Sequence, residues 1–155
     1  MSCASKETSL INHRFICSSN NNISRITNMV KSLCKQYSPV LLDLPPPDSM
    51  DVTLQAYHPF PKPSTLSDPQ VSATLRALGF GYRADFIQKT AKMLVDSHGT
   101  KISPDSSLEP SEVWLRTLRD MDTEIARTEL LKLMGVGRKV ADCILLMSLD
   151  KVIAE

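Results

Sequence analysis

The chain has 155 residues, enough for one ordinary globular domain with its own hydrophobic core. Its 42% hydrophobic and 23% charged residues are typical of soluble domains, and no apolar run approaches the roughly 20 residues of a membrane-spanning helix. The formal net charge is only +1, so affinity for a polyanion has to come from a local patch rather than from the whole molecule.

The start of the chain, residues 1–14, is polar and lacks both clear periodicity and a targeting pattern, so we expect a disordered N-terminal segment. Four apolar residues then recur at helical spacing: Ile23, Ile26, Val30 and Leu33. Because residues 18–20 (Ser-Ser-Asn) offer N-cap oxygens and Pro39 cannot continue a helix, we predict a helix that ends near Tyr37.

Proline dominates the next part, at about residues 39–63, which includes a Pro45-Pro46-Pro47 run. Such a run favours a polyproline-like excursion, so we predict a surface loop. A short extended piece at residues 40–42 is the only regular element that this part suggests.

Five apolar helical patterns follow, at residues 68–79, 84–98, 114–118, 125–133 and 140–147. Glycines close several of them, notably Gly79 and Gly99, and there is no internal repeat. Short helices joined by brief connections predict an all-α domain.

The four cysteines, Cys3, Cys17, Cys34 and Cys143, form no CxxC motif, and the three histidines are scattered along the sequence. We therefore expect no metal site, no cofactor and no disulfide framework. A reducing compartment is the environment that this pattern favours.

Residues 130–149, LLKLMGVGRKVADCILLMSL, place two helical patterns on either side of a Gly135-Val136-Gly137 turn. Glycine permits positive φ and leaves backbone amides bare just before a helix N-terminus, where they can bind a phosphate. Most turns of this kind only connect two helices, however, so the turn alone is weak evidence of function.

Lys139 follows this turn directly, beside Arg138. A cation at a helix N-terminus opposes the helix dipole, which makes lysine a poor structural choice there. With partial burial, the same position favours the neutral amine that acts as a nucleophile. Simple contact with a phosphate or solvent is the alternative, and the spacing alone slightly favours that alternative.

Three separated motifs carry a resemblance to a known family: FICSSNNNI at residues 15–23, LGFGYRA at 78–84 and GVGRKVADC at 135–143. Together, in this order, they resemble the eukaryotic 8-oxoguanine DNA glycosylase branch of the helix-hairpin-helix glycosylase superfamily. The similarity runs from about Phe15 to Lys151. The resemblance implies a helix-hairpin-helix glycosylase domain over residues 15–155.

The resemblance implies that Lys139 is the nucleophile, which attacks C1′ of the damaged nucleotide, forms a Schiff base and nicks the strand by β-elimination. Gly135 and Gly137 would hold the DNA backbone at the hairpin, and Cys143 would line the base pocket. Without the family, Cys143 would be an ordinary small core residue.

Four further residues match the family positions that hold the orphaned cytosine and its gap. Asn20 would enter the gap, Arg25 and Arg83 would hydrogen-bond the cytosine, and Tyr82 would wedge beside it. Each has an alternative: Asn20 as a helix N-cap, Arg25 as a surface arginine, and Tyr82 and Arg83 as the start of a helix.

The chain also departs from the family pattern. It stops at Glu155, before the family's assisting aspartate, and it lacks the family's C-terminal helices and N-terminal β-rich domain. Met134 stands where relatives carry proline, and we do not expect Asp142 to replace the aspartate. We therefore expect an incomplete domain, truncated at both ends, with marginal stability and exposed apolar faces.

The resemblance implies base excision repair: removal of 8-oxoguanine opposite cytosine, followed by strand nicking, by a bifunctional DNA glycosylase/AP lyase. The alternative is a catalytically dead fragment that acts only as a helix-hairpin-helix DNA-binding module. A helical interaction fragment without a DNA role is a third reading. The expected partner is damaged double-stranded DNA, and the expected state is a monomer with no membrane association. We expect the protein to be located in the nucleus, with the mitochondrion as a second location.

Overall fold

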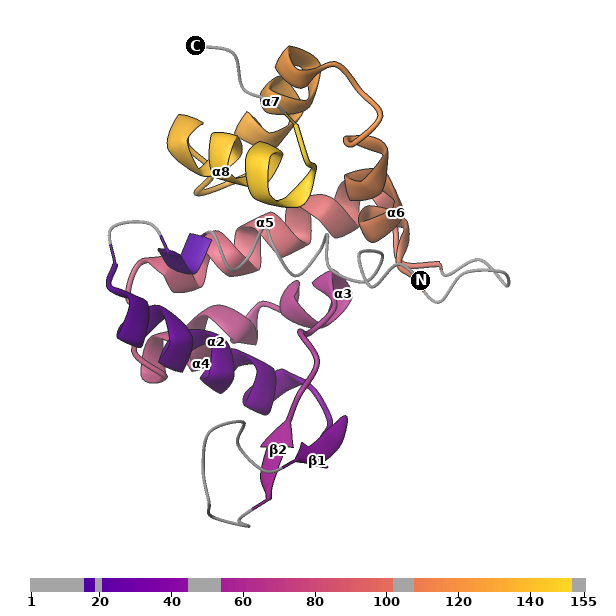
Figure 1. Cartoon of the computed structure of the whole chain (residues 1–155). Coiled ribbons are helices and arrows are strands. Elements are labelled where there is room, and N and C mark those ends of the chain that lie inside the picture. Colours follow the sequence, from indigo (N-terminus) through magenta and orange to yellow (C-terminus); the bar gives the residue numbers. More distant parts are fainter. Residues whose placement is uncertain (1–15, 19–20, 45–53, 102–107, 152–155) are drawn as a thin grey trace.

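The computed structural model describes residues 16–18, 21–44, 54–101 and 108–151, and these are mostly helical (Figure 1). The predicted disordered segment at residues 1–14 and the predicted role of Asn20 lie outside the described residues. The helices are α2 Ile23–Tyr37, α3 Pro63–Leu66, α4 Gln70–Ala77, α5 Arg83–His98, α6 Pro110–Thr117, α7 Thr123–Leu131 and α8 Arg138–Ser148. None of these helices is long and apolar enough to cross a bilayer.

Helix α5 lies at the centre of the described structure, with α2, α3 and α4 on one side and α6, α7 and α8 on the other (Figure 1). Its inward face carries a stripe of fully or almost fully buried residues at spacings of three and four: Ala84, Ile87, Ala91 and Leu94. This stripe is the one that the sequence predicted. Gly99 ends the helix with a φ of +80°, which glycine adopts without strain.

The hydrophobic core extends to both sides of α5. Its fully buried large side chains are Ile16, Leu33, Leu66, Leu75, Phe80, Ile87, Leu94, Leu115, Leu118, Leu130, Ile144 and Leu145. Each contributes roughly 1.5–3 kcal/mol by leaving water. Because α7 and α8 supply Leu130, Ile144 and Leu145, the same core that stabilises the domain fixes the position of the helical hairpin.

The proline-rich part contains a β-hairpin that the sequence did not predict. Strand β1, Leu42–Leu44, pairs antiparallel with β2, Gln55–Tyr57, so that Leu42 lies opposite Tyr57. His58 closes the base of the hairpin through a 2.8 Å hydrogen bond between its Nδ1 and the carbonyl oxygen of Ser38. The predicted surface loop at residues 39–63 is therefore partly regular structure.

Helix starts differ slightly from the prediction. The N-cap of α2 is Asn22, whose side chain accepts a 2.8 Å hydrogen bond from the Arg25 amide, rather than a residue at 18–20. At the start of α4, the Asp68 carboxylate accepts from the Gln70 amide at 2.8 Å. Both are short polar side chains that satisfy amides left free in a first helical turn.

Candidate functional site

The turn between α7 and α8 is held by contacts with α5. Leu133 and Val136 are buried, and the Thr90 hydroxyl of α5 donates a 2.5 Å hydrogen bond to the Met134 carbonyl oxygen. Gly135 has a φ of +80°, and a Cβ built there would lie 2.8 Å from the Cβ of Phe86. Glycine is therefore required both by the backbone conformation and by the close approach of Phe86.

Gly137 differs from Gly135 in conformation. Its φ is −86°, so it does not use the positive φ that glycine permits. It is the N-cap of α8, and a Cβ there would meet nothing within 4 Å. The absence of a side chain leaves the amides of the first turn of α8 open to an incoming anion.

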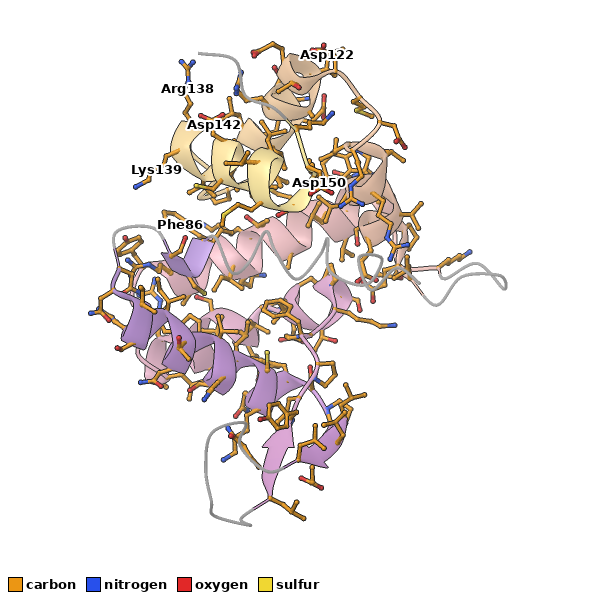
Figure 2. All side chains as sticks on the ribbon, in the orientation of Figure 1. Phe86, Asp122, Arg138, Lys139, Asp142 and Asp150 are labelled. Carbon is orange, nitrogen blue, oxygen red and sulfur yellow. The ribbon has the colours of Figure 1, made fainter. Side chains whose placement is uncertain are left out.

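Lys139 lies in the first turn of α8 and points outward from the helix (Figure 2). It is exposed, so the partial burial that would favour a neutral amine is not present in this structure. An open depression of about 410 Å³ adjoins it, lined by Arg138, Lys139, Asp142, Cys143 and Leu146. The structure thus brings together the predicted nucleophile and Cys143, one helical turn apart.

Arg127 on α7 is a buried charged residue near this depression, and sequence reasoning missed it. It is 8% exposed, and its Nε lies 2.7 Å from Oδ1 of Asp142. Its Nη1 pairs with Glu124 one turn earlier on α7. Hydrogen bonds to Glu124 and then to Asp142 raise the pKa of the Arg127 guanidinium above its usual value. The only sequence signal was an arginine on the face of α7 that also carries Leu130.

Arg25, Tyr82 and Arg83 form a second group where the start of α2 meets the turn before α5. Nη2 of Arg25, an exposed residue, donates a 3.1 Å hydrogen bond to the Gly79 carbonyl oxygen. The guanidinium of Arg83 lies 4.6 Å from the centre of the Tyr82 ring. Arg83 is only 4% exposed, whereas Tyr82 is 52% exposed. Tyr82 is therefore the more accessible of the two.

Phe86 joins the two groups of predicted residues. Its ring packs edge-on against Tyr82, with 5.6 Å between ring centres, and its side chain also lies close to the hairpin glycine Gly135. Tyr82 and Phe86 are four residues apart at the start of α5 and so share a helix face. That spacing was visible in the sequence, but the contact with Gly135 was not.

The sequence and the fold are similar to those of known proteins. A family model described as HhH-GPD superfamily base excision DNA repair protein matches residues 13–147. The N-glycosylase/DNA lyase of Saccharomyces cerevisiae is 40% identical over 136 residues, which are 87% of this chain and 33% of that protein. N-glycosylase/DNA lyase OGG1 of Arabidopsis thaliana is 40% identical over 139 residues, 89% of this chain and 32% of that protein.

Among solved structures, the apo-form of Clostridium acetobutylicum 8-oxoguanine glycosylase/lyase matches with a TM-score of 0.69 at 24% identity. The match covers 93% of this chain and 42% of that chain, so it supports the fold. This chain spans about one third of the length of the two curated relatives. Since the family model covers nearly the whole sequence, the chain belongs to the HhH-GPD superfamily of base excision DNA repair proteins.

Proposed function

We propose that this chain carries the nucleophilic hairpin of a bifunctional 8-oxoguanine DNA glycosylase/AP lyase. Such an enzyme removes 8-oxoguanine paired with cytosine and then nicks the DNA strand. The observation that carries the proposal is the exposed amine of Lys139, which lies at an open depression directly after a glycine turn. The two curated relatives, both named N-glycosylase/DNA lyase, support it.

The neutral amine of Lys139 attacks C1′ of the damaged nucleotide, and the bond from C1′ to the base breaks with its electron pair going to the base. Loss of a proton from the amine and opening of the sugar ring give a Schiff base. Removal of a C2′ proton then expels the 3′ phosphate. The nucleotide has to leave the duplex for this attack, which an exposed amine at an open depression accommodates.

The DNA backbone would bind at the N-terminus of α8. The first-turn amides have no acceptor within the helix, and Gly137 leaves them uncovered. Arg138 is exposed beside them and adds a positive charge. Because such contacts neutralise phosphates, binding should weaken steeply with salt.

The second group would hold the position opposite the lesion. Arg25 uses one donor on Gly79, so its other guanidinium donors remain available for an unpaired cytosine. Tyr82 is exposed enough to stack in the gap. Arg83 packs its guanidinium against the Tyr82 ring and keeps its proposed hydrogen bond to the cytosine. Asn20 and Cys143 keep their proposed roles in the gap and in the base pocket. We propose a monomer acting in the nucleus, with the mitochondrion as a second location.

A binding module without catalysis is the second candidate, and one observation favours it. Asp142 is the carboxylate that lines the depression beside Lys139. Its side chain already forms an ion pair with Arg127. Within the described residues, the depression therefore offers no uncommitted carboxylate to assist loss of the base. Such assistance is worth about 10²- to 10⁴-fold in rate.

Single-turnover cleavage assays separate these candidates. Purified chain is incubated with duplexes that carry 8-oxoguanine opposite cytosine, 8-oxoguanine opposite adenine, an abasic site, or no damage. The proposal predicts nicking of the abasic duplex and excision that prefers cytosine as the opposite base, both lost in Lys139→Gln. Salt-sensitive binding without cleavage of any duplex would overturn the enzymatic proposal and leave the binding module.

A further inference from the structure

Two lysines in the described part of the chain pair with carboxylates at helical spacing. Lys92 lies 3.1 Å from Asp96 on α5, and Lys132 lies 2.6 Å from Glu129 at the end of α7. Residues three or four apart share a helix face, so such pairs form readily. Asp142 follows Lys139 by three residues on α8 and meets the same condition.

The structure does not show the expected pair between Lys139 and Asp142 in its described part. Asp142 instead receives a hydrogen bond from the Nε of Arg127 at 2.7 Å. The Arg127 side chain is only 9% exposed and is also tied to Glu124, whereas Lys139 is exposed to solvent. A fixed guanidinium therefore competes for Asp142 against a flexible ammonium that would lose side-chain entropy on pairing.

We propose that Arg127 is a positioning residue that holds Asp142 away from Lys139 and so keeps the amine unpaired. If Asp142 paired with Lys139, the carboxylate would stabilise the protonated ammonium and reduce the fraction of neutral amine. This role rests on the proposed function for its biological meaning. The availability of the amine, however, is measurable without DNA.

Other charged or titratable groups face this site. Arg138 and Cys143 lie on α8 and line the same depression. Glu124 lies on α7 and pairs with Arg127. Arg138 disfavours a second positive charge nearby, and Glu124 is held by Arg127. Asp142 is therefore the carboxylate with the spacing to reach Lys139 once Arg127 is removed.

The test is reductive methylation of the folded chain with formaldehyde and cyanoborohydride, read by mass spectrometry. The rate at Lys139 is divided by the rate at Lys92 in the same molecule, from pH 6 to pH 9. Arg127→Met should lower this ratio about two- to fivefold near neutral pH and move the profile of Lys139 to higher pH. Arg127→Met with Asp142→Asn should restore the ratio, and Arg119→Met should not change it, because it breaks an ion pair with Asp150 instead.

The single variant Asp142→Asn retains Arg127 and provides the test if Arg127→Met does not fold. The proposal predicts an unchanged ratio for it, since Asp142 does not restrain Lys139 in the native protein. A rise of two- to fivefold would show that the two residues already pair, and would overturn the proposal. An unchanged ratio in folded Arg127→Met would overturn it as well.

Borohydride trapping on an abasic duplex separates this inference from the proposed function. If Lys139 methylation responds as expected but no variant forms a DNA adduct, the positioning role of Arg127 stands and the proposed lyase function fails. If the native chain forms the adduct but Arg127→Met leaves the methylation ratio of Lys139 to Lys92 unchanged, the function stands and the positioning role fails.

Discussion

Gly135 and Phe86 touch so closely that a Cβ on the glycine would lie 2.8 Å from both the Cβ and the Cγ of the phenylalanine. The contact fixes the turn of the helical hairpin against the first turn of α5. Since φ at Gly135 is +80°, any other residue there would strain the backbone, and its side chain would overlap Phe86.

Gly135→Ala should therefore lower the free energy of unfolding by about 2–4 kcal/mol, a large share of a typical domain stability. Urea unfolding monitored by circular dichroism measures this loss. Gly137→Ala is the matched control, because its φ is −86° and its Cβ would meet open space. It should cost about 1 kcal/mol or less, the difference between glycine and alanine at an N-cap. Equal losses for the two variants would contradict a close contact between Gly135 and Phe86.

Tyr82→Ala should leave stability within about 1 kcal/mol of the native value because the side chain is 52% exposed. It should weaken binding to a duplex with a flipped or missing base, since loss of an aromatic stacking partner costs about 1–3 kcal/mol. Fluorescence titration with an abasic duplex and an undamaged duplex measures the difference. Tyr82→Phe keeps the ring and should retain most of the preference. A native-like preference in Tyr82→Ala would exclude a wedging role.

His98 should make stability depend on pH. Its ring stacks on Trp114 with 4.6 Å between centres, and burial lowers its pKa below the ordinary value of 6.5. The unfolded chain then binds the proton more readily than the folded chain. Stability should thus be fully present above about pH 6.5 and decrease as the pH falls below it. Urea unfolding at pH 7.5 and 5.5 tests this, and His98→Phe should reduce the difference. A difference unchanged in His98→Phe would assign the pH dependence to other groups.

Helix α8 carries apolar residues on its outer face as well as its inner face. Leu146 and Met147 are 58% and 68% exposed, whereas Ile144 is 1% exposed. Met147→Ala should change the unfolding free energy by no more than about 0.5 kcal/mol, and Ile144→Ala should cost about 2–4 kcal/mol. We also expect the native chain to bind the dye ANS, with less fluorescence in Leu146→Gln combined with Met147→Gln. Background fluorescence of the native chain would contradict an exposed apolar face.

Helical periodicity predicted the large elements of the fold because each buries a continuous stripe, as α5 does from Ala84 to Leu94. It failed where the signal is short. Strand β1 has three residues, all exposed, so no alternation of buried and exposed positions marks it. Helix α3 is a single turn of four residues that starts at Pro63, too short for any periodic pattern.

The proposed site was predictable where a motif names a residue and its place on a helix. Lys139 lies in the first turn of α8 as expected, although it is exposed rather than partly buried. Phe86 and Arg127 escaped prediction because their roles depend on contacts between α5 or α7 and the hairpin, which sequence spacing does not encode. The conformation of Gly137 escaped for a related reason: the pattern GxG does not say which glycine takes the positive φ.

The most direct test of the account is the chemical identity of the nucleophile. The purified chain is mixed with an abasic duplex and borohydride, and the covalent adduct is digested and mapped by mass spectrometry. We predict an adduct on Lys139 that disappears in Lys139→Gln and persists in Lys132→Gln. An adduct on another lysine, or no adduct from folded protein, would contradict the assignment of Lys139 as the nucleophile.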